Sequence, residues 1–235
     1  MRHLSRVFLL VFLLLLPHYG LAGETAYLPR GQIDFSRLLA PPPAVGSPRQ
    51  QEEMAQLLAL QKERTPAQEA FALADADRSV FRFADVLGPD FTPGKLPLAE
   101  AFFRAVTKNA SALLGSAKEH WNRPRPYASN PDIHPCVPKP NNASYPSGHS
   151  TFATVTSILL ANMLPEKQDQ IYERAERYRF NREIGGVHYP SDVAAGRLAG
   201  TVIAAFLLED QAFQADFAKA RAEVRQALAL DPIAP

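Results

Sequence analysis

Residues 145–164 read YPSGHSTFATVTSILLANML, a polar turn that leads into a long apolar run. Ser147 is a favoured helix N-cap and Pro165 ends the run, so we expect a helix from about His149 to Met163. The unpaired N–H groups of its first turn and the helix dipole together form a site for an anion. Taken alone, an ordinary N-cap followed by a surface histidine explains the motif equally well.

Apolar residues at helical spacing predict further helices on both sides of this stretch. The expected ranges are about 49–64, 67–75, 79–86 and 97–121 before it, and about 166–183, 192–208 and 212–230 after it. Ser191 is expected to cap the helix that starts at Asp192. The sequence has no strand pattern of period two and no internal repeat, so the predicted class is all-α, a compact helical bundle around a shared core.

Composition and charge limit the classes of function. The chain has 235 residues, 46% of them hydrophobic and 21% charged, as expected for a soluble globular protein of one or at most two domains. Lys and Arg number 25 against 24 Asp and Glu, so no global basic field is available to attract nucleic acid. A single cysteine, Cys136, excludes an intramolecular disulfide framework and a multi-cysteine metal site.

The start of the chain has the pattern of a secretory signal peptide. A charged beginning, Met1–Arg6, precedes the apolar run Val7–Leu16, and small residues surround an expected cleavage after Ala22. The run is too short for a membrane anchor, which needs about 20 apolar residues. We therefore expect residues 1–22 to be removed, residues 23–235 to form a single helical domain, and the protein to be periplasmic or secreted. No later segment is expected to be long and apolar enough to cross a bilayer.

Two further clusters place polar residues at helix ends. Lys118 lies one turn before the end of a predicted helix and Arg125 lies in its proline-stiffened exit, where solvated cations are common in any case. In the other cluster, Arg182 ends one helix, His188 follows in a glycine turn, and Asp192 starts the next helix. A carboxylate four residues after a histidine can hold one imidazole nitrogen and fix its tautomer, and a surface turn with a capping aspartate is the alternative.

Together the three clusters supply three cations, a helix N-terminus, two histidines and a carboxylate. This set suits the binding of a tetrahedral oxyanion while one histidine attacks and the other protonates a leaving oxygen. Arginine binds phosphate through two parallel hydrogen bonds, and lysine adds a point charge. The sequence has no Walker loop, zincin helix or nucleophile elbow.

The type 2 phosphatidic acid phosphatase superfamily has a three-part signature that three blocks of this sequence resemble: Lys118-x6-Arg125-Pro126, Pro146-Ser147-Gly148-His149 and Arg182-x5-His188-x3-Asp192. That superfamily includes the bacterial class A non-specific acid phosphatases and the vanadium haloperoxidases. The signal peptide and the length resemble the class A enzymes most. The family fold implied by the resemblance is a compact, mostly helical bundle.

The resemblance implies a role for each motif residue. His188 would attack phosphorus and form a phosphohistidine, Asp192 would orient it, and His149 would protonate the leaving alkoxide. The phosphoryl oxygens would be held by Lys118, Arg125, Ser147, Gly148 and Arg182. No metal and no other cofactor is implied, because the three cations neutralise the charge that a metal ion neutralises elsewhere.

The sequence departs from the family pattern at Asn181, where a serine usually precedes the arginine of the third motif. Asparagine can still donate or accept a hydrogen bond, but it is larger, and it would shift Arg182 or mark a distinct subgroup. Some class A relatives carry a cysteine where Gly185 stands, so Cys136 lacks that partner in this chain.

The predicted function is an exported, metal-independent acid phosphatase that hydrolyses small phosphate monoesters through a phosphohistidine. One alternative is a vanadate-dependent haloperoxidase in which His188 ligates vanadium, although such enzymes are usually much longer. Another is a non-catalytic binder of phosphate or of a phospholipid headgroup, suggested only by Asn181. The sequence predicts no nucleic-acid partner and no stable membrane span, and it is compatible with a homo-oligomer.

Overall fold

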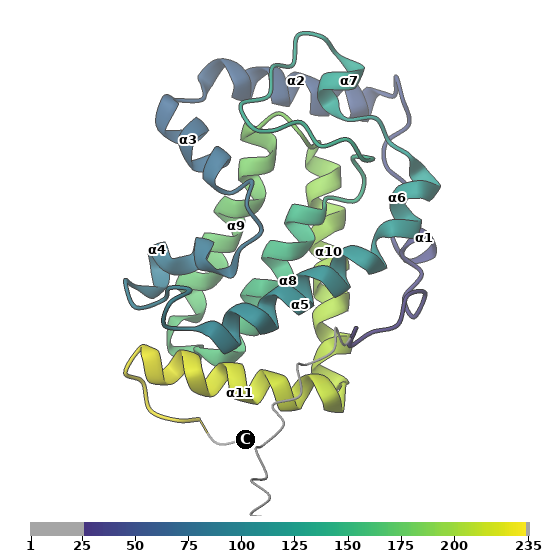
Figure 1. Cartoon of the computed structure of the whole chain (residues 1–235). Coiled ribbons are helices and arrows are strands. Elements are labelled where there is room, and N and C mark those ends of the chain that lie inside the picture. Colours follow the sequence, from purple (N-terminus) through teal and green to yellow (C-terminus); the bar gives the residue numbers. More distant parts are fainter. Residues whose placement is uncertain (1–25, 234–235) are drawn as a thin grey trace, which may run out of the picture.

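Three long helices form the centre of the protein: α8 (Gly148–Met163), α9 (Gln168–Ile184) and α10 (Pro190–Glu209). The structure is a computed structural model and describes residues 26–233. Helix α8 packs against both of the others, which lie on either side of it in Figure 1. Side chains on every face of α8 are buried, which explains why its sequence shows a continuous apolar run and not a one-sided stripe.

Two glycines of α10 let this helix approach α8 closely. A Cβ atom at Gly196 would lie 2.4 Å from the backbone oxygen of Ser147, and one at Gly200 would lie 2.8 Å from the backbone oxygen of Thr151. The Thr151 hydroxyl lies 3.0 Å from the carbonyl oxygens of both Ser147 and Gly196. The beginning of α8 is therefore fixed directly against α10.

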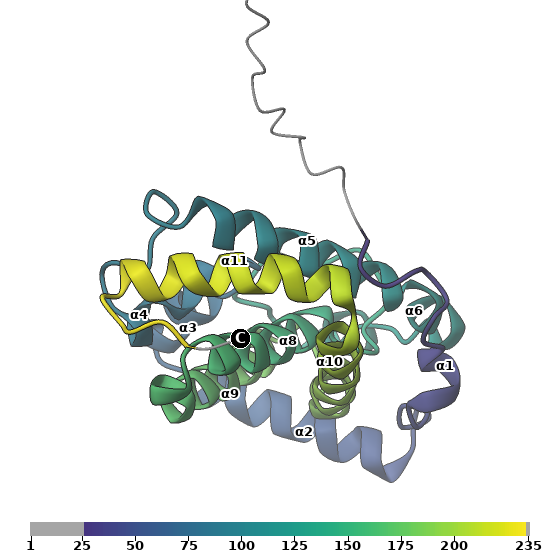
Figure 2. The same ribbon diagram turned by 90° about the horizontal axis from the view of Figure 1, so that it is seen from below.

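Helix α11 (Gln211–Ala227) lies across one end of the three central helices, and α5 (Pro97–Leu113) runs beside it (Figures 1 and 2). Phe102 of α5 packs against Phe213 and Phe217 of α11, with ring centroids 5.3 and 6.1 Å apart. These aromatic rings belong to the main buried cluster of the protein. Helices α5 and α11 thus close the core at that end.

Shorter elements cover the remaining sides. They are α1 (Phe35–Leu38), α2 (Pro48–Glu63), α3 (Pro66–Ala74), α4 (Ala84–Leu87), α6 (Gly115–Trp121), α7 (Pro126–Ser129) and the 3₁₀ turns η1 (Val80–Phe83) and η2 (Pro165–Lys167). Residues 26–233 contain no strand, so the prediction of an all-α bundle is confirmed.

Two predicted helices differ from those in the structure. The helix expected over residues 97–121 is broken at Leu114 into α5 and α6, where Gly115 is a weak helix former. The helix expected over residues 79–86 consists of η1 followed by α4. Neither difference moves Lys118, which still lies in the last turn of its helix.

One predicted cap is confirmed and one is wrong. Ser147 caps α8, because its hydroxyl oxygen accepts the backbone N–H of Ser150 at 3.3 Å. Ser191 does not cap α10, because the helix begins at Pro190 and Ser191 lies inside its first turn. Proline suits the first helical position because it has no N–H to leave unpaired there. The cap interaction comes from Asp192, which accepts the backbone N–H of Tyr189 at 2.9 Å.

Helix α10 is the one helix within residues 26–233 that is long and apolar enough to cross a membrane by length and composition. The expectation that no later segment has these properties is therefore wrong. In the protein α10 packs against α8 and α11, and 44% of its apolar window is buried. Burial against these helices accounts for part of its apolar composition. The predicted signal peptide, residues 1–22, lies outside the described residues.

Candidate active site

The three sequence motifs meet at the end of the central helices that lies away from α11 (Figure 1). The turn between α9 and α10 carries His188, the start of α8 carries Ser147, and the connection between α6 and α7 carries Arg125. Nη1 of Arg125 lies 3.0 Å from Nε2 of His188, and the backbone N–H of Ser147 donates to the carbonyl oxygen of Asp192 at 3.0 Å. Residues that are far apart in the sequence therefore form one site.

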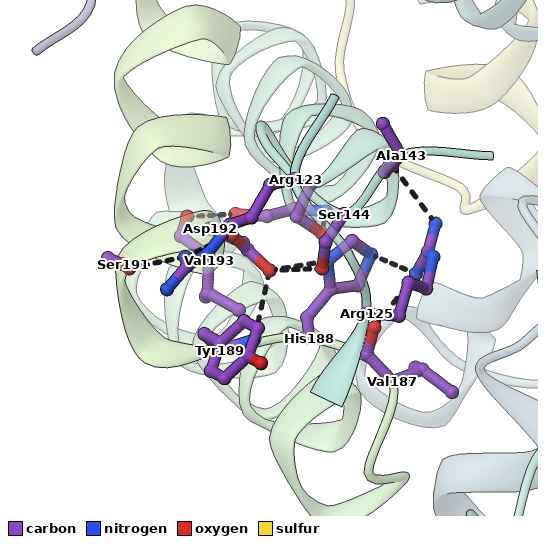
Figure 3. A network of polar contacts seen from close by, with 12 residues as sticks. Arg123, Arg125, Ala143, Ser144, Val187, His188, Tyr189, Ser191, Asp192 and Val193 are labelled. Atoms are coloured by element: carbon purple, nitrogen blue, oxygen red, sulfur yellow. Dashed lines mark hydrogen bonds and ion pairs between the residues drawn. The ribbon is translucent and has the colours of Figure 1, made fainter. Parts of the chain in front are cut away.

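His188 is buried and is held by Asp192 (Figure 3). Nδ1 of the imidazole lies 3.2 Å from Oδ2 of the carboxylate. Because a carboxylate only accepts hydrogen bonds, Nδ1 carries the proton and Nε2 keeps its lone pair. Asp192 is itself held by the Ser144 hydroxyl, which donates to Oδ2 at 2.5 Å. The predicted orientation of His188 by Asp192 is present in the structure.

The second oxygen of Asp192 contacts a buried ion pair that sequence reasoning missed. Oδ1 accepts from Nη1 of Arg123 at 2.6 Å, and Nη2 of Arg123 donates to Glu53 of α2 at 2.9 Å. The Arg123 guanidinium also lies over the Tyr189 ring, 3.9 Å from its centroid. Arg123 thus joins two buried carboxylates, one of which orients His188.

Hydrogen bonds hold the Arg125 guanidinium in a fixed orientation beside His188. Besides the contact with Nε2, its Nη1 donates to the carbonyl oxygen of Val187 at 2.8 Å. Its Nε and Nη2 donate to the backbone and side-chain oxygens of Asn142 at 2.9 and 2.7 Å. This arrangement places a positive charge beside the imidazole nitrogen that Asp192 leaves free.

Lys118 is the second motif cation and is half-buried. Its Nζ donates to the carbonyl oxygen of Ala143 at 2.7 Å. Burial and the nearby charge of Arg125 lower the pKa of Lys118 to about 7. The ammonium group therefore loses its proton near neutral pH unless an anion stabilises it.

Arg182 is the third motif cation, and it is almost completely buried at the end of α9. Its Nε and Nη1 atoms have no hydrogen-bond partner among the described residues. Burial, and then the charge of Arg125, lower its pKa to about 10, so it still carries a positive charge at neutral pH. An unsatisfied buried donor costs about 1–3 kcal/mol, and more when it is charged. Two such donors on one guanidinium favour binding of an anion.

The start of α8 places His149 in the same site. Nε2 of His149 lies 3.0 Å from the carbonyl oxygen of Ala76, and the ring is half-buried. Burial and the charge of Arg182 lower its pKa well below the usual value. At Gly148 a Cβ atom would meet only Nη1 of Arg78, at 4.0 Å, so the backbone there is open to a ligand.

Burial decides the direction of the pKa shift of His188, whereas hydrogen bonds and charges decide that of Asp192. It lowers the pKa of His188 to about 3, against the opposing effect of the hydrogen bond to Asp192. Burial alone would raise the pKa of Asp192, but its hydrogen bond to His188 and the charge of Arg123 bring it down to about 2. The pair is therefore a neutral imidazole beside a carboxylate at neutral pH.

Several contacts of the site had no usable signal in the sequence. Asn142 and Ser144 match a glycosylation sequon, a pattern that occurs often by chance, yet they hold Arg125 and Asp192. Glu53 reaches the site from a helix 70 residues away from Arg123 in the chain. Arg123 stands two residues before Arg125, and that proximity was the one available hint.

The residues of the site do not form a typical metal centre. Among residues 26–233, no group of three or more His, Cys, Asp or Glu side chains is arranged to hold a metal ion. Cys136 is a free, partly buried thiol whose sulfur lies 3.7 Å from the carbonyl oxygen of Ile184. On the Nε2 side of His188 the neighbouring polar group is the Arg125 guanidinium, and a cation suits an oxyanion.

Comparison with known proteins identifies the family. Residues 101–215 match the PAP2 superfamily. An acid phosphatase of Zymomonas mobilis is 30% identical over 198 residues, which cover 80% of this chain and 75% of that protein. A non-specific acid phosphatase of Providencia stuartii is 31% identical over 208 residues, which cover 84% of each chain.

A solved structure agrees with these matches at the level of the fold. A bacterial vanadium-dependent iodoperoxidase superposes with a TM-score of 0.56 and 17% identity, over 73% of this chain and 52% of that chain. The chain belongs to the PAP2 superfamily. The predicted class of enzyme, a phosphoric monoester hydrolase, is confirmed by its phosphatase relatives.

Proposed function

We propose that the chain is an exported acid phosphatase that hydrolyses phosphate monoesters without a metal, through a phosphohistidine intermediate. The observation that carries the proposal is the pair of unpartnered buried donors on Arg182, in a site where Asp192 holds His188 as a neutral nucleophile. Arg125, Lys118 and Arg182 supply three positive charges to neutralise the phosphoryl oxygens. The open backbone at the start of α8 adds N–H donors and the helix dipole.

In the first step Nε2 of His188 attacks phosphorus, and the N–P bond forms as the bond to the alkoxide oxygen breaks. Asp192 stabilises the positive charge that develops on the imidazole. His149 gives its proton to the alkoxide, which leaves as an alcohol.

In the second step a water molecule attacks the phosphohistidine. His149, now neutral, takes a proton from this water. The bond from the water oxygen to phosphorus forms as the N–P bond breaks, and inorganic phosphate is released. The same residue acts as acid and then as base, as the reverse path requires. His188 returns to its neutral form with Nδ1 still bound to Asp192.

In the proposed mechanism His149 becomes protonated only when the substrate binds. Burial and Arg182 hold the pKa of His149 well below its usual value, so the free enzyme has a neutral imidazole there. A phosphate group between these cations offsets their charge and raises the pKa of His149. A substrate monoanion can supply the proton as it binds.

A colorimetric assay with p-nitrophenyl phosphate, with and without EDTA, tests metal independence. Activity should survive the chelator and should be inhibited by vanadate, which resembles the five-coordinate transition state of phosphoryl transfer. Loss of activity with EDTA that zinc or magnesium restores would contradict the proposal. Peroxide-dependent oxidation of iodide by the vanadate-loaded protein would support the haloperoxidase alternative instead.

Variants of the two histidines test the proposed intermediate. His188→Ala should form no phosphoenzyme with any substrate when the reaction is quenched with alkali, in which the P–N bond of phosphohistidine is stable, whereas the wild type should. His149→Ala should lose about 10²–10⁴ in rate on alkyl phosphates and much less on p-nitrophenyl phosphate, whose leaving group needs little protonation. A phosphoenzyme in His188→Ala, or equal losses of His149→Ala on both substrates, would refute the assigned roles. Phosphate binding without turnover in the wild type would favour the non-catalytic binder.

Export is supported by the sequence of the first residues. The charged start, the apolar run Val7–Leu16 and the small residues before Gly23 match a cleavable signal peptide. Expression in a Gram-negative host followed by cell fractionation and N-terminal sequencing tests this part. A mature protein in the periplasm that begins near Gly23 is expected, and a cytoplasmic protein that retains Met1 would refute export.

A further inference from the structure

We propose that Asn181 is a positioning residue for the general acid. Together with the carboxylate of Asp75, it holds the turn whose Ala76 carbonyl oxygen binds His149. The inference rests on the proposed function, in which His149 protonates the leaving oxygen. Asn181 does not touch His149 directly, so its effect passes through the turn.

The turn lies directly after α3 and is anchored by a fully buried carboxylate. Oδ2 of Asp75 accepts from Nδ2 of Asn181 at 2.8 Å and from Nη1 of Arg174 at 3.0 Å. Oδ1 accepts from Nη2 of Arg174 at 2.6 Å and from Nε of Arg82 at 3.0 Å. Each carboxylate oxygen of Asp75 therefore accepts a hydrogen bond from a side chain of α9. Of the two donors on this helix, Arg174 is charged and Asn181 is uncharged.

One face of α9 carries the side chains that bind this turn. Arg174, Tyr178 and Asn181 are spaced by four and three residues, which places them on one side of the helix. The Tyr178 hydroxyl donates to the carbonyl oxygen of Asp77 at 2.6 Å. The turn is thus held on both sides of Ala76, whose own carbonyl oxygen binds His149.

This carbonyl decides which nitrogen of His149 can give a proton. A carbonyl oxygen only accepts, so Nε2 of His149 carries a hydrogen in both charge states of the ring. The second proton of the imidazolium is then on Nδ1. The transferable proton therefore has one defined position as long as the turn holds Ala76 in place.

The two histidines are oriented by partners of opposite character. Asp192 binds Nδ1 of His188 with a full negative charge, which stabilises a positive imidazole. Ala76 binds Nε2 of His149 with a neutral carbonyl, which orients the ring and stabilises its charge much less. Because a neutral carbonyl stabilises the imidazolium less than a carboxylate does, His149 releases its proton more readily, as a general acid must. Asn181 keeps that arrangement while adding no charge beside Arg182.

Two variants of Asn181 test the inference. Asn181→Leu keeps the branched shape of the side chain and removes the donor, and Asn181→Ser shortens the side chain so that it no longer reaches Asp75 in the same geometry. For each, we expect kcat on β-glycerophosphate to fall about tenfold, a part of the range that a general acid contributes. The loss on p-nitrophenyl phosphate and the change in the vanadate inhibition constant should each stay within about threefold. Asn162→Ser is the matched control, because Asn162 is exposed on α8.

The ¹⁵N chemical shifts of the His149 ring provide a reading that does not depend on activity. The wild type should show a protonated Nε2 and an unprotonated Nδ1, and Asn181→Ser should show a mixture of the two tautomers. Equal losses on both substrates, no loss on either, or unchanged ¹⁵N shifts in Asn181→Ser would overturn the proposal. If Asn181→Leu does not fold by circular dichroism, Asn181→Ser decides.

His149→Ala separates this inference from the proposed function. If that variant loses activity equally on both substrates, the acid role of His149 is wrong, and the tautomer measurement still decides whether Asn181 positions the ring. If it shows the selective loss while the Asn181 variants do not, only the positioning role is wrong.

Discussion

Arg125 donates a hydrogen bond to the nitrogen of His188 that the proposed reaction uses, with Nη1 and Nε2 3.0 Å apart. The other imidazole nitrogen is bound to Asp192, so the attacking lone pair of His188 points at a guanidinium. A phosphoryl group must therefore take over this hydrogen bond before attack. The same residue can thus hold the nucleophile in place and then bind the substrate.

Replacing Arg125 should weaken anion binding and change the titration of His188. In Arg125→Met we expect the vanadate inhibition constant to rise about 10- to 100-fold, because a hydrogen bond to a charged group contributes about 1.5–3 kcal/mol. The pKa of His188 should also rise, because the Arg125 charge is one of the influences that lower it. NMR titration of His188 measures this, with Arg49→Met on the surface as the control. An unchanged pKa of His188 would contradict the electrostatic effect of Arg125.

Asp192→Asn should damage turnover much more than binding. The amide can place its N–H against Nδ1 and favour the wrong tautomer of His188, and the same change in a Ser-His-Asp triad lowers kcat by about 10⁴. The vanadate inhibition constant should change only a few-fold, since Asp192 does not face the anion in the proposed site. Near-full activity, or a loss of vanadate binding as complete as that in Arg182→Ala, would show that Asp192 is not the orienting group.

Lys118 should set the alkaline limit of activity. Its pKa is lowered to about 7, so its charge is present below pH 7 and is lost as the pH rises above that value. Because the protonated form is the one proposed to bind the phosphoryl group, kcat/KM should fall about tenfold per pH unit on the alkaline side. In Lys118→Arg the guanidinium stays charged, so this limb should move up by at least about one pH unit. An identical alkaline limb in the variant would assign it to another group.

Gly196→Ala should disturb the proposed site although Gly196 is not one of its residues. The new Cβ atom would lie 2.4 Å from the Ser147 backbone oxygen, so α8 and α10 must separate at the point where α8 begins. We expect a loss of about 1–3 kcal/mol in the free energy of unfolding, as for other overpacked cores, with weaker vanadate inhibition. The control is Gly115→Ala in α6, where a Cβ atom meets nothing within 4 Å and alanine should be neutral or stabilising. Equal melting curves for the two variants would contradict the close contact.

Glu53→Gln should test the buried ion pair behind Asp192. Removing one charge leaves Arg123 with less compensation in the interior, and breaking such pairs costs about 3–5 kcal/mol. A lower melting temperature and a reduced kcat are expected, with vanadate inhibition little changed. Glu52→Gln on the exposed side of the same helix is the control. If both variants melt alike, the Glu53–Arg123 pair is not a stabilising contact.

The helices and the site motifs could be predicted because their signals are local. A helix repeats every 3.6 residues, and its caps lie within a few residues of its ends, so Ser147 and Pro165 were sufficient markers for the start and the end of α8. The motif residues were recognisable for the same reason: each block is a short run at a helix end. The predictions failed where two local signals competed, as at Leu114, where a helical stripe continues across a glycine, and at Ser191, where a proline begins the helix first.

The sequence by itself determined the helical class of this protein and its family, and it predicted the residues of the proposed phosphate site. The tertiary structure decided how those residues are held: Glu53 behind Arg123, Ser144 on Asp192, and the turn after α3 on His149. Each of these contacts joins elements at least 40 residues apart, between Ser144 and Asp192 at 48 positions and between Ala76 and His149 at 73. Such contacts depend on how whole helices pack against one another, and no short stretch of sequence contains that arrangement.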